Sequence, residues 1–324
     1  MQHPTTVNAP NRSTREAQDA DEHAHNLTNW QQEYDQLGGG RFYGRIDEVA
    51  LEGCQLFREH TNRALRQQCN VWKDALWLGI PVQNADCRIN GLPLSAEQLM
   101  CRPGERDFEL ITPDSFDIYG IVIREEMLLK LAEQQERRID LTRLANSPRL
   151  SVSQGQLDRI RQILQQVLDL NARGLGSSQQ RQLASEALLD LLDNSLQTEH
   201  SAPSYTRRKQ VVDRIKALIR EQPDADLSIP ELCQRLHVSR RTLQYSFESI
   251  LGISPLQFLR SARLNQVRRT LSNPQQDSTV ATIAAQHGFW HPGQFARDYK
   301  ALFGENPSET FKRARTSLSR TDHG

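Results

Sequence analysis

Arginine and amide side chains recur on two segments near the C-terminal end of the chain, in types and at a spacing that suit contact with base edges. The first set is Ser239, Arg240, Arg241, Thr242, Gln244 and Tyr245, and the second is His291, Gly293, Gln294, Arg297 and Lys300. Arginine can donate two parallel hydrogen bonds to guanine, and glutamine can pair in the same way with adenine. The two sets predict two surfaces that read double-stranded DNA.

Both sets lie in an internal repeat of about 51 residues. The copies read SIPELCQRLHVSRRTLQYSFESILGISP at 228–255 and TVATIAAQHGFWHPGQFARDYKALFGENP at 279–307, with one residue inserted in the second copy. Each copy predicts a helix, a tight turn and a second helix, over about 229–250 and 280–303. Ser239 suits the N-cap of the first outer helix, whereas His291 is a weaker N-cap residue ahead of Pro292.

A glycine near the end of each second helix, Gly252 and Gly304, suits a left-handed C-cap, and a proline follows three residues later. The segment between the copies predicts a connecting helix over 255–272, which at 1.5 Å per residue is about 27 Å long. Such a spacer would place the two outer helices about one turn of B-DNA apart, roughly 10–10.5 base pairs.

Charge is segregated along the chain. Residues 203–320 carry 19 Lys and Arg against 10 Asp and Glu, whereas residues 1–202 carry 21 against 29. A basic C-terminal part joined to an acidic N-terminal part indicates that only the former meets a polyanion.

The N-terminal part predicts an α+β domain. Leu27, Trp30, Tyr34 and Leu37 have helical spacing over 27–37, and residues 41–123 have the short β-branched and aromatic runs of a small antiparallel barrel or sandwich, with a tight turn at Asn90-Gly91. Helices are expected at 125–145, 153–172 and 178–196. We expect a disordered tail at 1–25, an effector-sensing and oligomerisation domain at 26–197, a linker at 198–206, and an all-α domain with the two helix-turn-helix motifs at 207–315.

Several other classes of protein are disfavoured. The five cysteines, Cys54, Cys69, Cys87, Cys101 and Cys233, form no C-x-x-C pair, so we expect reduced thiols in a cytoplasmic protein and no zinc site. Residues 41–123 contain one histidine, His60, which argues against a metal-dependent oxygenase. No phosphate-binding loop or nucleophile elbow marks an enzyme, and no run of about 18 apolar residues predicts a membrane span.

The motifs LHVSRRTLQYSF, PLQFLRSARLNQVRRTL and GFWHPGQFARDYKALFGENP resemble those of the AraC/XylS family of transcription regulators. The resemblance implies that both hairpins lie in one seven-helix DNA-binding domain. We expect RNA polymerase as a partner, and a homodimer formed through the amphipathic helices at 153–196. The segment Trp290-His291-Pro292-Gly293 departs from the small polar residues usual in the family. That departure bears on which residues of the second helix touch bases.

The likeness extends from about residue 25 over most of the chain, through WQQEYDQL, FREHTNRALRQ, LGIP and RPGERDFELITPD, to family members that regulate ethanolamine-utilisation operons. It implies an activator whose effectors are ethanolamine and adenosylcobalamin. Trp72, Trp77 and Glu109 could cage a small cation, although both tryptophans also suit an ordinary core. The alternative is a constitutive repressor or DNA-architectural protein whose N-terminal half only oligomerises.

Overall fold

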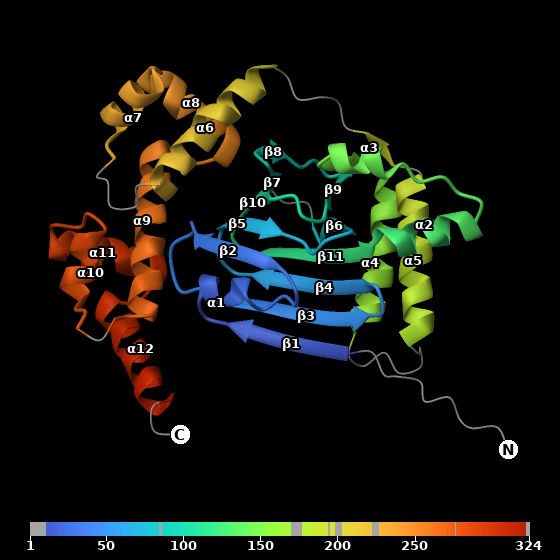
Figure 1. Ribbon diagram of the computed structural model, residues 1–324, viewed down its shortest axis with the longest axis horizontal. Helices are drawn as coiled ribbons and strands as arrows, with labels where there is room; N and C mark the ends of the chain where they lie inside the picture. The colour runs from blue at the N-terminus through green and yellow to red at the C-terminus, as the bar shows by residue number, and fades with distance from the viewer. Residues whose placement is uncertain are drawn as a thin grey trace. The chain divides into compact units, whose positions relative to one another are not determined.

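A computed structural model describes residues 11–83, 86–169, 177–193, 195–197, 203–221, 227–275 and 277–321 (Figure 1). The chain divides into two compact units. The first takes in the chain up to Tyr34 together with 43–62 and 67–199, and the second takes in 35–42, 63–66 and the chain from His200. The short segments 35–42 and 63–66, which we expected in the sensing domain, therefore group with the C-terminal unit.

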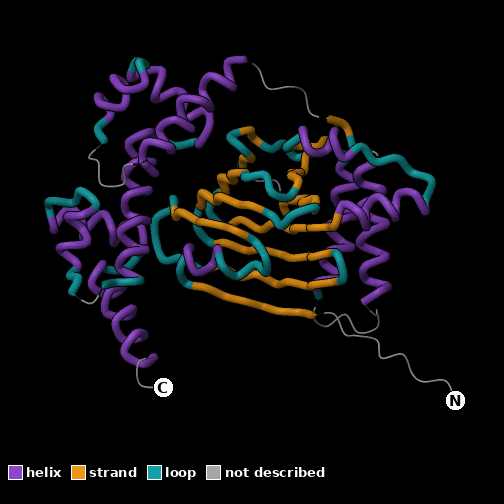
Figure 2. The backbone as a smooth tube through the Cα atoms, viewed as in Figure 1, coloured by secondary structure: helices purple, strands orange, loops and turns teal. Residues whose placement is uncertain are grey.

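The described strands form two β-sheets, as Figure 2 shows, and of their residues only 35–36 and 65–66 group with the second unit. The larger sheet has the order β1 (Asn11–Ala17), β3 (Gly44–Leu51), β4 (Cys54–Thr61), β11 (Phe116–Arg124), β6 (Ala75–Pro81), β9 (Gln98–Pro103), β12 (Arg149–Ser151) and β13 (Leu196–Gln197). The smaller sheet has the order β2 (Gln31–Gln36), β5 (Leu65–Asn70), β10 (Phe108–Thr112), β7 (Arg88–Ile89) and β8 (Leu92–Pro93).

The predicted α+β class is confirmed, but the expected barrel is not closed. Among the described residues, no strand of one sheet pairs with a strand of the other. The strands at one end of each sheet, β12 and β13 in the larger and β7 and β8 in the smaller, have only two or three residues each. Such short edge strands provide too few hydrogen bonds to join the sheets, so the unit is an open sandwich.

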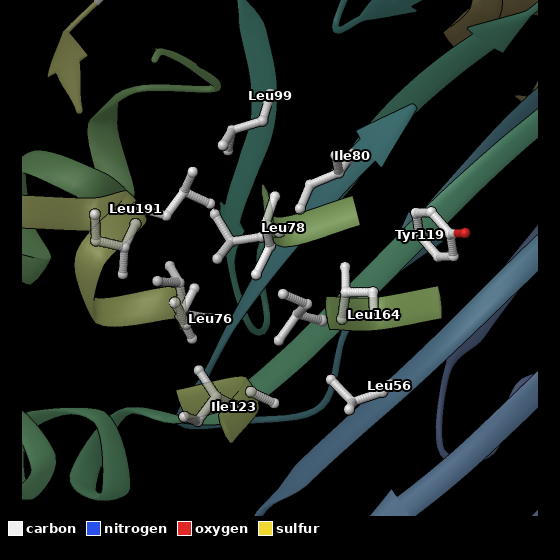
Figure 3. Packing of buried hydrophobic residues seen from close by; sticks show 14 of the residues in the cluster. Leu56, Leu76, Leu78, Ile80, Leu99, Tyr119, Ile123, Leu164 and Leu191 are labelled. Atoms are coloured by element: carbon white, nitrogen blue, oxygen red, sulfur yellow. The ribbon is translucent and has the colours of Figure 1, made fainter. Parts of the chain in front are cut away.

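One face of the larger sheet is covered by α2 (Glu125–Gln134), α3 (Leu141–Asn146), α4 (Gln154–Leu168) and α5 (Ser177–Asp193). The register of the strands aligns apolar side chains on this face, because Tyr119 lies opposite Ile80 and Ile121 opposite Leu78. Figure 3 shows Tyr119, Ile80 and Leu78 packed with Leu164 of α4 and Leu191 of α5, and Ile121 belongs to the same cluster. Burying each such side chain stabilises the fold by about 1.5–3 kcal/mol.

The opposite face of the larger sheet is turned toward the smaller sheet and carries aromatic and polar side chains. Trp77 stacks on Phe108 of the smaller sheet with ring centroids 4.7 Å apart, and Trp30 meets Trp77 edge-on at 6.0 Å. Two carboxylates, Glu48 and Glu59, are also buried there. Glu59 accepts hydrogen bonds from the Tyr34 hydroxyl and lies 3.1 Å from Nε2 of His23.

Two expectations for the N-terminal segment are wrong. The predicted tail at 1–25 is ordered from Asn11 onward, since β1 pairs with β3 and α1 (Ala20–Ala24) follows; residues 1–10 lie outside the described part. The helix predicted at 27–37 is instead strand β2. Trp30 and Tyr34 fit a helix by spacing, but an interval of four residues also places them on one face of an extended chain. Pairing of β2 with β5 decides between the two.

Other boundaries also move. The helix expected at 125–145 is two helices, α2 and α3, separated where Glu136 takes a φ of +55°. Helix α6 begins at Pro203, so residues 203–206 of the expected linker are helical, and 198–202 lie outside the described residues. The helices expected at 153–172 and 178–196 are present as α4 and α5, but α5 ends at Asp193 and Leu196 belongs to β13, while 170–172 lie outside the described residues. The Asn90-Gly91 turn is also confirmed, with φ of +51° and +80° between β7 and β8.

The C-terminal part of the second unit is entirely helical in its described residues. Its helices are α6 (Pro203–Glu221), α7 (Ile229–Leu236), α8 (Arg240–Leu251), α9 (Pro255–Ser272), α10 (Val280–Gln286), α11 (Pro292–Phe303) and α12 (Pro307–Thr321). Among the described residues, no helix of either unit combines the length and apolar character needed to span a lipid bilayer.

Candidate nucleic-acid interface

The first hairpin consists of α7 and α8, and its turn is built by local sequence signals. Ser228 caps α7, and His237 ends it in the left-handed conformation at φ +51°. The backbone N–H of Val238 then bonds to the carbonyl of Cys233, which satisfies a helix-end carbonyl. The Ser239 hydroxyl accepts from the N–H of Thr242 at 3.1 Å and begins α8, as predicted.

The second hairpin, α10 and α11, repeats this geometry with a weaker N-cap on α11. Gly288 takes the left-handed position at φ +80°, and the N–H of Phe289 bonds to the carbonyl of Ala284. Pro292 occupies the first turn of α11, but His291 provides no side-chain hydrogen bond at the N-cap. The predicted helix-turn-helix geometry is therefore present twice.

The second helix of each hairpin, α8 and α11, ends as expected and packs its inner face on an apolar core. Gly252 and Gly304 adopt left-handed φ values of +73° and +70° at the ends of α8 and α11. On the inner faces, Leu243 and Phe247 of α8 and Tyr299 of α11 are fully buried. The connecting helix α9 spans Pro255–Ser272, with the bounds that the sequence predicts, and packs against α8, α10 and α12.

All the residues proposed to face DNA are exposed. They are Ser239, Arg240, Arg241, Thr242, Gln244 and Tyr245 on the first hairpin, and His291, Gly293, Gln294, Arg297 and Lys300 on the second. Their exposure gives each hairpin one polar outer face that is free of core contacts.

On α8 the arginines are available, while two neighbours are engaged. The side chains of Arg240 and Arg241 make no hydrogen bond or ion pair within the described part of the chain. Gln244 donates to Glu248 at 2.6 Å. The guanidinium of Arg208, on α6, lies 5.3 Å from the centroid of the Tyr245 ring. A further cation is therefore located beside this face.

On α11 the polar side chains bond to one another. Arg297 donates to Gln294 at 2.9 Å and to the Gly293 carbonyl at 3.3 Å. Gln294 in turn donates to Asp298 at 2.7 Å, and Asp298 pairs with Arg260 of the connecting helix. The side chain of Lys300 has no such partner in the described residues. The two helices therefore differ in how many donors they leave free.

Behind α11, a polar network fixes α12 to the hairpin. Glu305 pairs with Arg268 at 3.0 Å and with Arg313 at 2.8 Å, and it accepts from the Thr310 hydroxyl at 2.7 Å. Burial would raise the pKa of Glu305, but hydrogen bonds from Arg313 and Thr310 and the two positive charges outweigh it and lower the pKa to about 2. Burial raises the pKa of the neighbouring Tyr299 to about 12.

The three residues suggested for a cation cage do not surround one space. Trp77 lies between the sheets, stacked on Phe108. Glu109 follows Phe108 in β10, and alternation along a strand places it on the opposite face. Trp72 is half-buried in the loop before β6, with no ring contact to Trp77. The carboxylates that share the inter-sheet face with Trp77 are Glu48 and Glu59, which the spacing of residues in the sequence does not reveal.

The cysteines are unpaired thiols. Cys54, Cys69, Cys87 and Cys101 are buried, and Cys233 is half-buried on α7. Burial raises the pKa of Cys54, Cys87 and Cys101 to about 12, which leaves those thiols protonated and unreactive at neutral pH. Within the described residues, no cluster of three metal-ligating side chains occurs.

Comparison with known proteins agrees with the paired hairpins. A family described as a helix-turn-helix domain matches residues 232–313. The XylDLEGF operon transcriptional activator 2 of Pseudomonas putida is 31% identical over 117 residues, which are 36% of this chain and 74% of that protein. The chain belongs to the AraC/XylS family of transcription regulators.

Other relatives also match only part of the chain. The XylDLEGF operon transcriptional activator 1 of Pseudomonas putida is 29% identical over 132 residues, 40% of this chain and 39% of that protein. The chain thus matches about two-fifths of the length of that relative. A crystal structure of a probable AraC family transcriptional regulator from Rhodopseudomonas palustris is 33% identical, covering 32% of this chain and 97% of that one, with a TM-score of 0.31.

Proposed function

We propose that this AraC/XylS-family DNA-binding regulator is an effector-responsive activator that recruits RNA polymerase. The observation that carries the proposal is the pair of hairpins whose outer helices each present an exposed polar face. Family members similar to it are named as transcriptional activators of an operon. A helix held at its N-terminus by a partner helix fits the major groove of B-DNA, and two such helices spaced by α9 suit two consecutive turns.

The test uses the full chain. A binding-site selection from random duplexes should yield two conserved subsites about 10–10.5 base pairs apart. Arg241→Ala should relax one subsite, and a reporter downstream of the selected site should rise in output when the wild-type chain is expressed. Specific binding with constant or reduced output would favour the repressor or architectural alternative. If the selection enriches no sequence, the chain does not bind DNA sequence-specifically and the proposed function is wrong.

For the effector, we propose a small ammonium compound bound between the sheets of the first unit. Aromatic faces and carboxylates together suit an ammonium group. Trp77, Glu48 and Glu59 are buried on the inter-sheet face of the larger sheet, and Trp30 packs edge-on against Trp77. The Nε1 atom of Trp77 is buried without a hydrogen-bond partner. Ethanolamine acting with adenosylcobalamin is the pair we propose, because of the sequence resemblance that begins near residue 25.

Calorimetry tests the binding of ethanolamine and of adenosylcobalamin separately. The full chain should bind ethanolamine, and Glu59→Gln should weaken binding more than Glu109→Gln does. Titration of adenosylcobalamin with and without ethanolamine tests whether the two act together. Heat from neither compound would contradict this pair, while leaving the DNA-binding proposal to its own test.

Self-association is proposed for the helices of the first unit. Partly buried apolar residues Ile163, Leu183 and Ala187 line a groove between α4 and α5 that also carries Arg159 and Asp190. A self-complementary face of this kind fits a two-fold dimer. Sedimentation of the wild type and of Leu183→Glu should show a dimer that the charged variant converts to monomer.

A further inference from the structure

The turns of the two hairpins differ by a single residue whose position can be fixed from the backbone. Val238 and Phe289 are equivalent, since each N–H bonds to the matching carbonyl of the preceding helix, Cys233 and Ala284, 51 positions apart. In the first hairpin the N-cap Ser239 follows Val238 at once. In the second, Trp290 stands between Phe289 and the N-cap His291. Trp290 is therefore the extra residue, without a counterpart in the first hairpin.

Trp290 is placed outward rather than in the core. Its side chain is 70% exposed, whereas that of Trp77 is 2% exposed. A tryptophan can bury a large apolar area, so leaving it in water forfeits substantial stabilisation. The preceding Phe289 fills the inner position instead, 5.1 Å from the ring of Phe295. The second aromatic ring of the turn, that of Trp290, therefore lies on the surface.

The surroundings of Trp290 are open and carry few free donors. His291, Pro292 and Gly293 are exposed, and a Cβ added to Gly293 would meet no atom within 4 Å. The next two side chains that could read bases, Gln294 and Arg297, bond to each other. At its N-terminal end, the second outer helix therefore offers an apolar ring where the first offers Arg240 and Arg241.

Thymine is the base that presents an apolar group in the major groove, its C5-methyl, and side chains read it by apolar contact. We propose that Trp290 is a specificity-determining residue of the second hairpin and packs on a thymine methyl in the second subsite. This inference rests on the proposed DNA-binding function. The side chain of Lys300, on the α11 helix that follows Trp290, has no partner in the described residues, and its cation suits a phosphate contact.

Replacing thymine by uracil tests the contact, because it removes the methyl group and keeps every hydrogen-bonding group. Each thymine of the second subsite is replaced in turn in the selected site, and the affinity of the full chain is measured. One replacement should weaken wild-type binding by about fourfold, as expected for the loss of about 0.8 kcal/mol from one buried carbon. Trp290→Ala should bind the thymine site more weakly than wild type and respond to no uracil replacement.

Two further variants keep the test decisive. Leu256→Ala removes another exposed apolar side chain, 66% exposed at the start of α9, and should bind and respond to uracil as wild type does. Trp290→Phe retains an aromatic ring and should keep part of the response, with circular dichroism confirming the fold of each variant.

Equal uracil responses in the wild type and Trp290→Ala would overturn the assignment. So would a Trp290→Ala chain that binds its site normally but fails to activate a reporter, which would make Trp290 a contact for a protein partner. A wild-type chain that enriches no sequence at all would instead refute the proposed function, so the two failures are distinguishable.

Discussion

Nη2 of Arg297 donates a hydrogen bond to Oε1 of Gln294, 2.9 Å away and three residues earlier on α11. Both residues are among those that the sequence predicts to read bases. The bond makes them one unit, because neither can turn to a base without either releasing the other or carrying it along. Arg241 on α8 has no such partner among the described residues. The two hairpins should therefore respond differently to substitution.

A double-mutant cycle in DNA affinity measures this unit. We expect the losses from Gln294→Ala and Arg297→Ala to be non-additive, with a coupling of about 0.5–3 kcal/mol typical of residues in contact. The pair Arg241→Ala and Arg297→Ala, on separate hairpins, serves as the control and should add within about 0.3–0.5 kcal/mol. Additive losses for Gln294 and Arg297 would show that the bond does not persist on DNA.

Salt dependence separates phosphate contacts from base contacts. Arg241→Ala should cost about 1–3 kcal/mol on the selected site and relax preference at one position. Lys300→Ala should weaken binding to all sequences about equally and reduce the slope of log K against log salt by about one. Filter-binding titrations at several salt concentrations, on specific and scrambled duplexes, distinguish the two. An unchanged slope for Lys300→Ala would remove it from the phosphate contacts.

The unequal N-caps predict opposite effects on stability. Ser239→Ala removes a side-chain bond to the helix end and should lower the free energy of unfolding by about 1 kcal/mol. His291 makes no such bond, so His291→Ser should raise it by about 0.5–1 kcal/mol. Urea denaturation followed by far-ultraviolet circular dichroism compares the two. Destabilisation by His291→Ser would indicate that the imidazole has a packing role in the turn.

The hairpins could be predicted from sequence because their signals are local. Ser239, Gly252 and Gly304 determine where helices begin and end within a few residues, and repetition of the pattern supports the assignment. The inserted residue was visible in the alignment of the two copies. Its identity as Trp290 required the backbone bonds that equate Val238 with Phe289, since sequence alone allows the insertion at neighbouring positions.

The sheets were predicted less well because their order depends on contacts distant in sequence. The spacing of Trp30 and Tyr34 fits both a helix and a strand, and pairing with a strand thirty residues later decides. Similarly, β1 reads as a polar tail until β3 is placed beside it. The grouping of Trp77 with Glu48 and Glu59, rather than with Glu109, follows from strand register, which composition does not specify.

Acid should weaken the attachment of α12 through Glu305. Its pKa is about 2 in the folded chain, below the ordinary value of 4.5, because bonds to Arg313 and Thr310 and the charge of Arg268 favour the carboxylate. A depressed folded-state pKa contributes stability that is fully present above about pH 4.5 and is lost as pH falls toward 2. The contribution is at most on the order of 3 kcal/mol.

Glu305→Gln should therefore lower the free energy of unfolding of the helical unit near pH 6, and the difference from wild type should shrink steadily between pH 4.5 and 2. Urea denaturation at a series of pH values, followed by the helical circular dichroism signal, gives that difference. Asp277→Asn, which alters an exposed carboxylate, is the matched control and should track the wild type. A Glu305→Gln difference that stays constant across this pH range would show that the side chain stabilises the unit by packing and not through its charge.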